Sequence, residues 1–295
     1  MRLLALLLAL LAAVSAAVAM VGQWIHNHRG RVYQAANRVF KRFSAAGPVQ
    51  AAGRRFPRFW KFLGARLSPG GYLGLHLTVG LVLSLLAIAA FGFVAYSIFS
   101  RRSVEHTDRM AVTMVREELG PGYVDLFKGF AFLGNGETVA FIGLGILVLL
   151  LVTKRKPLLI GWTSAVMGAW ILESGLKLIF RRTRPEDALI PLPSSYSFPS
   201  GHALVSLVTY GMLAYLMWQA VRNRRLRTVL LPLFVVIIIC IGLSRIYLGV
   251  HYFSDVMGGY AAGITWLAAV ISGLEVVRRR SLIKSETLTT PTGTT

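Results

Sequence analysis

The run TVLLPLFVVIIICIGLSRIYL at residues 228–248 decides the fold class, because it holds no charged residue until Arg245, close to its end. About 20 apolar residues in a helix cross the roughly 30 Å hydrocarbon core of a bilayer. The apolar residues follow one another without alternating with polar ones, which favours a helix over a strand of a membrane barrel. The run therefore predicts a membrane-spanning helix that brings an arginine to one side of the membrane.

Six further apolar runs indicate a polytopic membrane protein. They cover residues 3–25, 72–99, 133–152, 158–180, 203–221 and 254–277. The chain of 295 residues is 55% hydrophobic, more than a soluble globular protein normally carries. We therefore predict an all-α fold, with a six-helix core at residues 72–280 and one extra N-terminal apolar helix at residues 1–25.

Basic residues give the chain a formal net charge of +20 and cluster between the apolar runs. Residues 26–71 carry ten Lys or Arg and no acid, and further clusters follow the third, fifth and seventh runs. This pattern follows the positive-inside rule, so we expect no nucleic-acid partner. It places the basic segments in the cytoplasm. Segments 100–132, 181–202 and 249–253 then lie outside, in a multi-pass protein of the bacterial inner membrane.

The segments at the two ends of the chain carry separate expectations. Residues 1–25 also resemble a secretory signal peptide, but cleavage would leave the basic segment 26–71 outside, so we expect an uncleaved span. Two helical patterns within 26–71 predict basic amphipathic helices, either on the anionic cytoplasmic leaflet or against the cytoplasmic helix ends. The polar residues 281–295 predict a disordered tail. The single cysteine, Cys240, excludes a disulfide framework and a cysteine-based metal site.

Three motifs with chemical side chains fall on segments that the charge pattern places on one side of the membrane. They are KLIFRRTRP at residues 177–185, PSGH at residues 199–202 and SRIYLGVHYFSD at residues 244–255. The basic clusters indicate this side of the membrane independently of the motifs. Their agreement therefore indicates that the motifs form one site.

Cations and helix-end groups in these motifs suit a phosphate. Lys177, Arg184 and Arg245 are costly near a membrane unless an anion compensates them. Arginine offers forked donors for phosphate oxygens, and lysine offers a point charge. Ser200 and Gly201 begin an apolar helix, so they present free N–H groups and the positive end of its dipole. We predict that these five residues bind phosphate.

Histidines in the second and third motifs suit phosphate-ester hydrolysis. His251 and Asp255 are four residues apart, so on a helix the carboxylate accepts from one ring nitrogen and leaves the other free as a nucleophile. His202 comes from another helix and is predicted to protonate the leaving oxygen. The three predicted catalytic residues are therefore His251, His202 and Asp255.

The three motifs, in this order, resemble the signatures of the type-2 phosphatidic acid phosphatase superfamily, over about residues 72–280. The resemblance implies a metal-independent phosphatase without a cofactor, acting through a phosphohistidine on His251. It implies phosphatidic acid, phosphatidylglycerophosphate, a polyprenyl diphosphate or a lipid A-type phosphate as the substrate. Two other classes stay open: a lipid-to-lipid phosphotransferase that uses the same phosphohistidine, and a non-enzymatic anion transporter.

Several nearby residues carry smaller predictions. Glu173 is expected to pair with Lys177 one helical turn later. Arg181 and Arg182 either support the phosphate or headgroup contacts from behind the site or act as interfacial anchors. Gly259 and Gly263 predict a close helix–helix contact, and Asn135 resembles a helix cap.

Overall fold

The computed structural model describes residues 72–100 and 104–289 and, before residue 72, only residues 9, 12–17, 20 and isolated positions from 34 to 57. The predicted extra helix at 1–25 and the amphipathic helices within 26–71 fall mostly outside the described residues. The chain divides into two compact units, residues 1–19 with 84–267, and residues 20–83 with 268–295. The predicted site residues all belong to the first unit.

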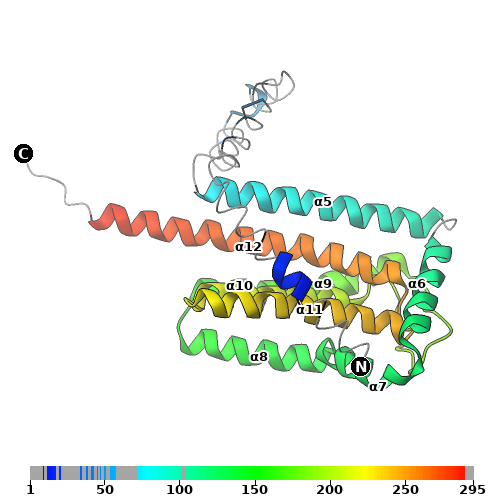
Figure 1. Cartoon of the computed structure of the whole chain (residues 1–295). Coiled ribbons are helices and arrows are strands. Elements are labelled where there is room, and N and C mark those ends of the chain that lie inside the picture. Colours follow the sequence, from blue (N-terminus) through cyan, green and yellow to red (C-terminus); the bar gives the residue numbers. More distant parts are fainter. Residues whose placement is uncertain are drawn as a thin grey trace, which may run out of the picture. The chain divides into compact units, whose positions relative to one another are not determined.

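Eight α-helices and one short 3₁₀ helix make up residues 72–100 and 104–289, and those two stretches contain no strand (Figure 1). They are α5 (Tyr72–Ser100), α6 (Val104–Leu119), the 3₁₀ turn Pro121–Tyr123, α7 (Val124–Leu133), α8 (Gly136–Val152), α9 (Lys156–Phe180), α10 (Gly201–Ala220), α11 (Arg224–Tyr247) and α12 (Phe253–Thr289). The all-α prediction is confirmed.

Five segments of the described chain are long and apolar enough to cross a membrane. They are Gly80–Ser100, Pro121–Val152, Gly201–Ala220, Val229–Tyr247 and Phe253–Arg278. Helix α9 coincides with the predicted run 158–180 but is not among the five, because Glu173, Lys177 and several Gly, Ser and Thr residues lower its apolar character. The exact number of spans in the core therefore stays a prediction.

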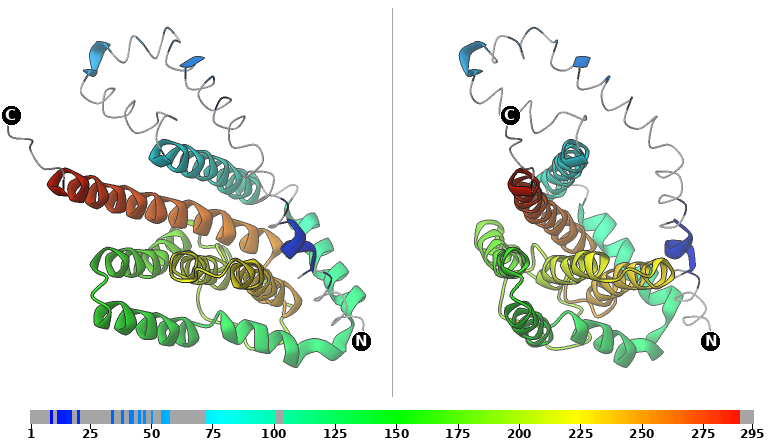
Figure 2. Two further views of the ribbon diagram at one scale, coloured as in Figure 1. Left: turned by 60° about the vertical axis from the view of Figure 1, so that its left-hand side comes forward. Right: turned by 90° about the vertical axis from the view of Figure 1, so that its left-hand side faces the viewer.

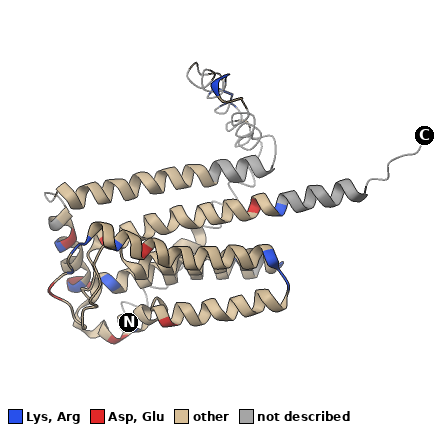
Figure 3. Ribbon diagram, turned by 180° about the vertical axis from the view of Figure 1, so that it is seen from behind, with Lys and Arg blue, Asp and Glu red and all other residues tan. Residues whose placement is uncertain are grey.

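The helices of the first unit alternate in direction, so that chemical groups gather at one end. Helices α9 and α11 finish at the end where α8, α10 and α12 begin (Figure 1). Helix α10 packs against both α9 and α11, and α8 packs against α9 (Figure 2). Charged residues lie mainly at the two ends of these helices, with uncharged helix middles between them (Figure 3).

Local sequence explains where the helices that carry the site begin and end. Helix α9 has Pro157 in its first turn, where a missing N–H costs no hydrogen bond, and it ends at Arg181 in the left-handed conformation. Helix α10 begins directly after Ser200, which makes no side-chain capping bond. The extended segment between these two points carries the Arg-Pro and Pro-Ser parts of the motifs.

Helix α12 is longer than the sequence predicts. It continues through residues 281–289, where the polar composition predicts a disordered tail. The sequence SLIKSETLT has neither glycine nor proline, so nothing in it stops a helix before Pro291, which disfavours helical backbone in the residue before it. Composition alone therefore underestimates the length of this helix.

Glycines hold α12 close to α10 beside the site. A Cβ on Gly259 would lie 2.7 Å from the carbonyl oxygen of Ser200, and one on Gly263 would lie 3.2 Å from that of Leu204. Any side chain at Gly259 would push the start of α10 away. The predicted helix–helix contact at these glycines is confirmed.

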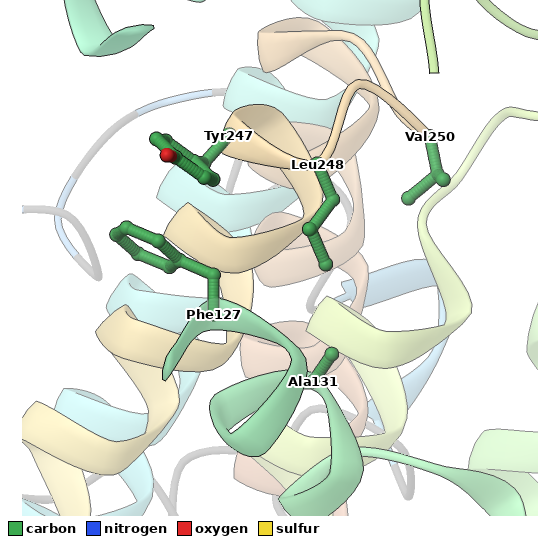
Figure 4. Close-up of a cluster of buried hydrophobic side chains, with 5 residues drawn as sticks. All are labelled: Phe127, Ala131, Tyr247, Leu248 and Val250. Atoms are coloured by element: carbon green, nitrogen blue, oxygen red, sulfur yellow. The ribbon is translucent and has the colours of Figure 1, made fainter. Parts of the chain in front are cut away.

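A buried apolar cluster supports the linker that carries His251. Phe127 and Ala131 of α7 pack with Tyr247, Leu248 and Val250 (Figure 4). The rings of Phe127 and Tyr247 stack with centroids 4.2 Å apart. Since burying one such side chain stabilises a fold by about 1.5–3 kcal/mol, the cluster fixes the residues next to His251.

Candidate active site

A cavity of about 680 Å³ lies at the end of the bundle where α9 finishes and α10 begins. Six of the eight predicted site residues line it: Lys177, Arg184, Gly201, His202, Arg245 and His251. The other two, Ser200 and Asp255, are fully buried beside it. All three motifs therefore meet in one place, although as many as 74 positions separate His251 from Lys177 (251 − 177).

Arg184 is held in place by the chain around it. Its Nη1 donates to the carbonyl oxygen of Val250 at 2.8 Å, and its Nε donates to that of Ser195 at 2.8 Å. Its Nη2 also contacts the hydroxyl of Ser195 at 3.0 Å. Burial lowers the pKa of Arg184, but this group still titrates far above neutral pH. The guanidinium is thus a fixed positive charge at the cavity wall.

His251 lies between this arginine and a carboxylate. Its Nε2 is 3.1 Å from Nη1 of Arg184, and its Nδ1 is 3.5 Å from Oδ2 of Asp255. Arginine can only donate, so Nε2 carries the lone pair and Nδ1 carries the proton that faces Asp255. Burial, opposed in part by Asp255, lowers the pKa of His251 to about 4. The imidazole is therefore neutral at pH 7, with Nε2 unprotonated.

Asp255 is fixed by more donors than the sequence indicates. Its Oδ2 accepts from the hydroxyl of Ser197 and from the backbone N–H of Tyr252 at 2.9 Å. Its Oδ1 accepts from Nη1 of Arg182 at 2.6 Å. A buried carboxylate with this many partners stays ionised and keeps one orientation.

Arg182 forms the centre of a buried ion-pair network. Besides Asp255, it contacts Oδ2 of Asp108 at 2.8 Å, and its guanidinium lies 4.1 Å from the ring centroid of Tyr252. Its pKa is raised: burial acts to lower it, and the two aspartates outweigh that effect. Of the two roles left open for Arg182, these contacts favour support from behind the site, because Arg182 pairs with the aspartate that faces His251.

Asp108 is a site residue that the sequence analysis missed. It lies on α6, is fully buried, and accepts from both the backbone N–H and the hydroxyl of Ser254 at 2.8 Å. Its partners are 74 and 146 positions away in the chain. No local spacing could reveal it, and the only signal was an acid in a chain with 12 Asp and Glu.

Helix α6 also fixes two segments next to the cavity through Arg116. Its Nε donates to the carbonyl oxygen of Tyr247 at 3.1 Å, and its Nη2 donates to that of Asp187 at 2.8 Å. In return, the hydroxyl of Tyr247 donates to the carbonyl oxygen of Gly120 at 2.6 Å. This helix thus ties the end of α11 to the loop after α9.

Ser200 before α10 and Arg245 of α11 carry unpaired buried donors at the cavity or beside it. Within the described chain, the hydroxyl of Ser200 and Nε of Arg245 are buried without a hydrogen-bond partner. Helix α10 also has no side-chain cap, so the N–H groups of its first turn are not used by one. Unpaired buried donors are costly, and an anion bound here would satisfy them.

His202 contacts Asn135, which occupies the N-cap position of α8, as predicted. Asn135 precedes α8 but makes no capping bond. Its Oδ1 lies 2.8 Å from Nε2 of His202. An amide oxygen only accepts, so Nε2 carries a proton and Nδ1 is the remaining ring nitrogen. The asparagine side chain therefore fixes the histidine, which explains why it makes no capping bond to its own helix.

Lys177 pairs with Glu173, as predicted. Its Nζ lies 2.5 Å from Oε1 of Glu173 and 3.3 Å from the hydroxyl of Ser195.

Arg181 has a different role from Arg182 next to it, because its Nε donates to the carbonyl oxygen of Leu178 at the end of α9. The described residues contain no group of three or more His, Cys, Asp or Glu side chains placed to hold a metal ion.

Comparison with known proteins finds relatives of this chain. A family profile described as the PAP2 superfamily matches residues 158–278. Decaprenylphosphoryl-5-phosphoribose phosphatase of Mycobacterium tuberculosis is 32% identical over 168 residues, which cover 55% of this chain and 85% of that protein. Phosphatidylglycerophosphatase B of Bacillus subtilis is 32% identical over 113 residues, 37% of this chain. That alignment spans 54% of the Bacillus protein.

A solved structure has the same fold. The crystal structure of a transmembrane PAP2-type phosphatidylglycerolphosphate phosphatase from Bacillus subtilis superimposes with a TM-score of 0.58 at 24% identity. The match covers 66% of this chain and 98% of that one. Asp108 and Asn135 lie outside the segment that the family profile matches, so a motif search does not find them.

Proposed function

The chain belongs to the PAP2 superfamily, and from this premise we propose that it is a membrane phosphatase that hydrolyses a lipid phosphomonoester or diphosphate through a phosphohistidine. The observation that carries the proposal is the environment of His251. Its Nε2 is unprotonated beside Arg184, and its Nδ1 faces Asp255. A nucleophile with its lone pair next to a fixed cation is arranged to attack a phosphate that the cation binds.

In the first half-reaction, Nε2 of His251 attacks phosphorus and forms an N–P bond while the P–O bond to the lipid breaks. His202 enters this step as the imidazolium: its Nε2–H stays on Asn135, and its Nδ1 gives a proton to the departing oxygen, which leaves the ring neutral. Arg184, Arg245 and the N–H groups at the start of α10 take up the negative charge that spreads over the phosphoryl oxygens. Asp255 compensates the positive charge that develops on the attacking imidazole.

In the second half-reaction, water replaces the lipid alcohol. His202, now neutral, accepts a proton from this water as its oxygen attacks phosphorus. The N–P bond breaks, inorganic phosphate leaves, and His251 returns to its starting form. Transfer to another lipid would follow the same path with a lipid hydroxyl in place of water.

We also propose that the site faces away from the cytoplasm. The opposite end of the helices is basic. Lys154 and Arg155 join α8 to α9, Lys156 begins α9, and Arg222 and Arg227 lie near the start of α11. Basic residues of this kind are retained on the cytoplasmic side. Phosphate groups of lipids in the outer leaflet would then be at the level of the cavity.

Phosphate release by the purified protein in detergent, with EDTA present, tests the activity. The panel contains phosphatidic acid, phosphatidylglycerophosphate, a polyprenyl diphosphate and a lipid A-type phosphate, with His251→Ala as the control. Release that resists EDTA and is lost in the variant supports the proposal. An acceptor lipid that gains phosphate without release of free phosphate would instead favour transfer, and no reaction above the variant would contradict both.

A further inference from the structure

One carboxylate reaches the cavity among the cations that are proposed to bind phosphate. Among the cavity-lining residues of the described chain, Glu173 is the only acidic one. It is 9% exposed, and its Oε1 lies 2.5 Å from Nζ of Lys177. Its Oε2 accepts from the hydroxyl of Ser174 at 3.3 Å. The proposed mechanism gives this buried negative charge no role.

Glu173 reduces the positive charge available to a substrate. Lys177, Arg184 and Arg245 line the cavity, but Lys177 is already paired with this carboxylate. Arg184 binds only backbone oxygens, Ser195 and His251 in the described chain. Within the part of the chain that the structure describes, Arg184 and Arg245 therefore form no ion pair with a carboxylate, and one phosphate group can occupy both.

The position of Glu173 places its charge on the side of the proposed acid. A Cβ on Gly201 would lie 2.5 Å from Oε1 and 3.1 Å from Cδ of Glu173. Gly201 immediately precedes His202, so the carboxylate lies against the turn that carries the group proposed to protonate the leaving oxygen. A leaving group that meets His202 thus departs close to a negative charge.

We infer that Glu173 makes the site selective for phosphomonoesters over diphosphates, an inference that rests on the proposed function. With a monoester, the P–O bond breaks to release an alcohol, which takes the proton of His202 and is uncharged. With a diphosphate, the same N–P bond forms, but the leaving group is an alkyl phosphate that carries its own negative charge. Two like charges a few ångströms apart in a partly buried site repel by several times the thermal energy. Lys177 screens part of this repulsion, because it pairs with the same carboxylate, and the remainder disfavours the charged leaving group.

A matched pair of substrates tests this selectivity. Farnesyl phosphate and farnesyl diphosphate share one chain and differ only in the second phosphate. For the native protein we expect kcat/KM to favour the monophosphate by about tenfold or more. In Glu173→Gln, which removes the charge and keeps the shape, we expect this ratio to fall by about tenfold. Glu275→Gln is the control, because it removes a carboxylate that pairs with Arg278 and does not line the cavity.

The outcomes separate the inference from the proposed function. Equal hydrolysis of both lipids by the native protein, or a preference for the diphosphate, overturns the proposed selectivity. An unchanged ratio in Glu173→Gln overturns it too. Neither result affects the proposal that the protein is a phosphatase. If neither farnesyl lipid is hydrolysed, phosphatidic acid and its diphosphate counterpart form the matched pair. No phosphate release from these or from the other panel lipids overturns both proposals. If Glu173→Gln does not fold, Glu173→Asp keeps the charge and must keep the native preference; its loss would overturn the inference.

Discussion

Nε2 of His251 lies 3.1 Å from Nη1 of Arg184, and this contact determines which tautomer the histidine adopts. Because arginine has no acceptor, the imidazole must present a lone pair to it. The proton is then on Nδ1, facing Asp255. A phosphate bound to Arg184 would be brought to the nitrogen that can attack it. The fold thus sets both the position and the protonation of the proposed nucleophile.

Acid should inactivate the protein by protonating His251. The pKa of this buried imidazole is lowered to about 4, so its lone pair is present at neutral pH and is lost as the pH falls through about 4. We therefore expect kcat/KM to fall at acid pH as His251 becomes protonated. The measurement needs a correction for the protonation of the substrate's own phosphate group. An inflection from His251 near its ordinary value of about 6.5 would contradict this environment.

The same lowered pKa affects stability. Between about 4 and 6.5 the unfolded chain binds a proton at His251 that the folded protein does not, so the free energy of unfolding should rise with pH in this window. The contribution is complete above the unfolded pKa and is lost as the pH falls toward the folded one. Thermal unfolding in detergent at several pH values measures it, and His251→Asn should flatten the slope. An equal slope in the variant would contradict the assignment.

Arg182 should be essential for stability, because it separates two buried carboxylates. Asp108 and Asp255 are both fully buried, and Arg182 lies within 2.8 Å of an oxygen of each. Its replacement in Arg182→Gln leaves both carboxylates without their counter-ion, which costs about 3–5 kcal/mol in buried pairs. We expect a large fall in melting temperature. Arg181→Gln, next to it but exposed, is the control, and equal melting of the two variants would contradict the network.

Asn135 should act through His202. Removing its oxygen in Asn135→Ala frees the histidine to turn, so proton donation to a poor leaving group weakens. General acid catalysis contributes about 10²–10⁴-fold, and we expect Asn135→Ala to lose part of it on an alkyl phosphate. An aryl phosphate, whose phenolate leaves without a proton, should be much less affected. Equal losses on both substrates would indicate a structural role only.

Arg245 should contribute to phosphate binding directly. Its Nε is buried without a partner in the described chain, and it lines the cavity. Since a hydrogen bond to a charged group contributes about 1.5–3 kcal/mol, Arg245→Gln should weaken inhibition by inorganic phosphate by roughly ten- to a hundredfold. Arg278→Gln serves as the charge-matched control. Unchanged inhibition in Arg245→Gln would place this guanidinium outside the phosphate site.

The sequence predicts the helices and the meeting of the motifs, because apolar length and basic clusters fix direction and sidedness. The Glu173–Lys177 pair and the glycine contact of α12 are also readable, since both follow from spacing along one helix. Asp108, Ser197 and Asn135 are not, because each meets its partner only through tertiary packing. Ser197 is 58 positions from Asp255 in the sequence, and Asn135 is 67 positions from His202.

The central claim is a covalent bond between phosphorus and Nε2 of His251. The most direct test is to mix the purified protein with a labelled lipid phosphate and quench in alkali, which preserves a phosphoramidate, within one turnover. Peptide mass spectrometry then locates the label. We expect the phosphate on His251. With a leaving group that needs no proton, more of this phosphohistidine should accumulate in His202→Gln than in the native protein. Label on another residue, or turnover without any phosphorylated protein, would contradict it.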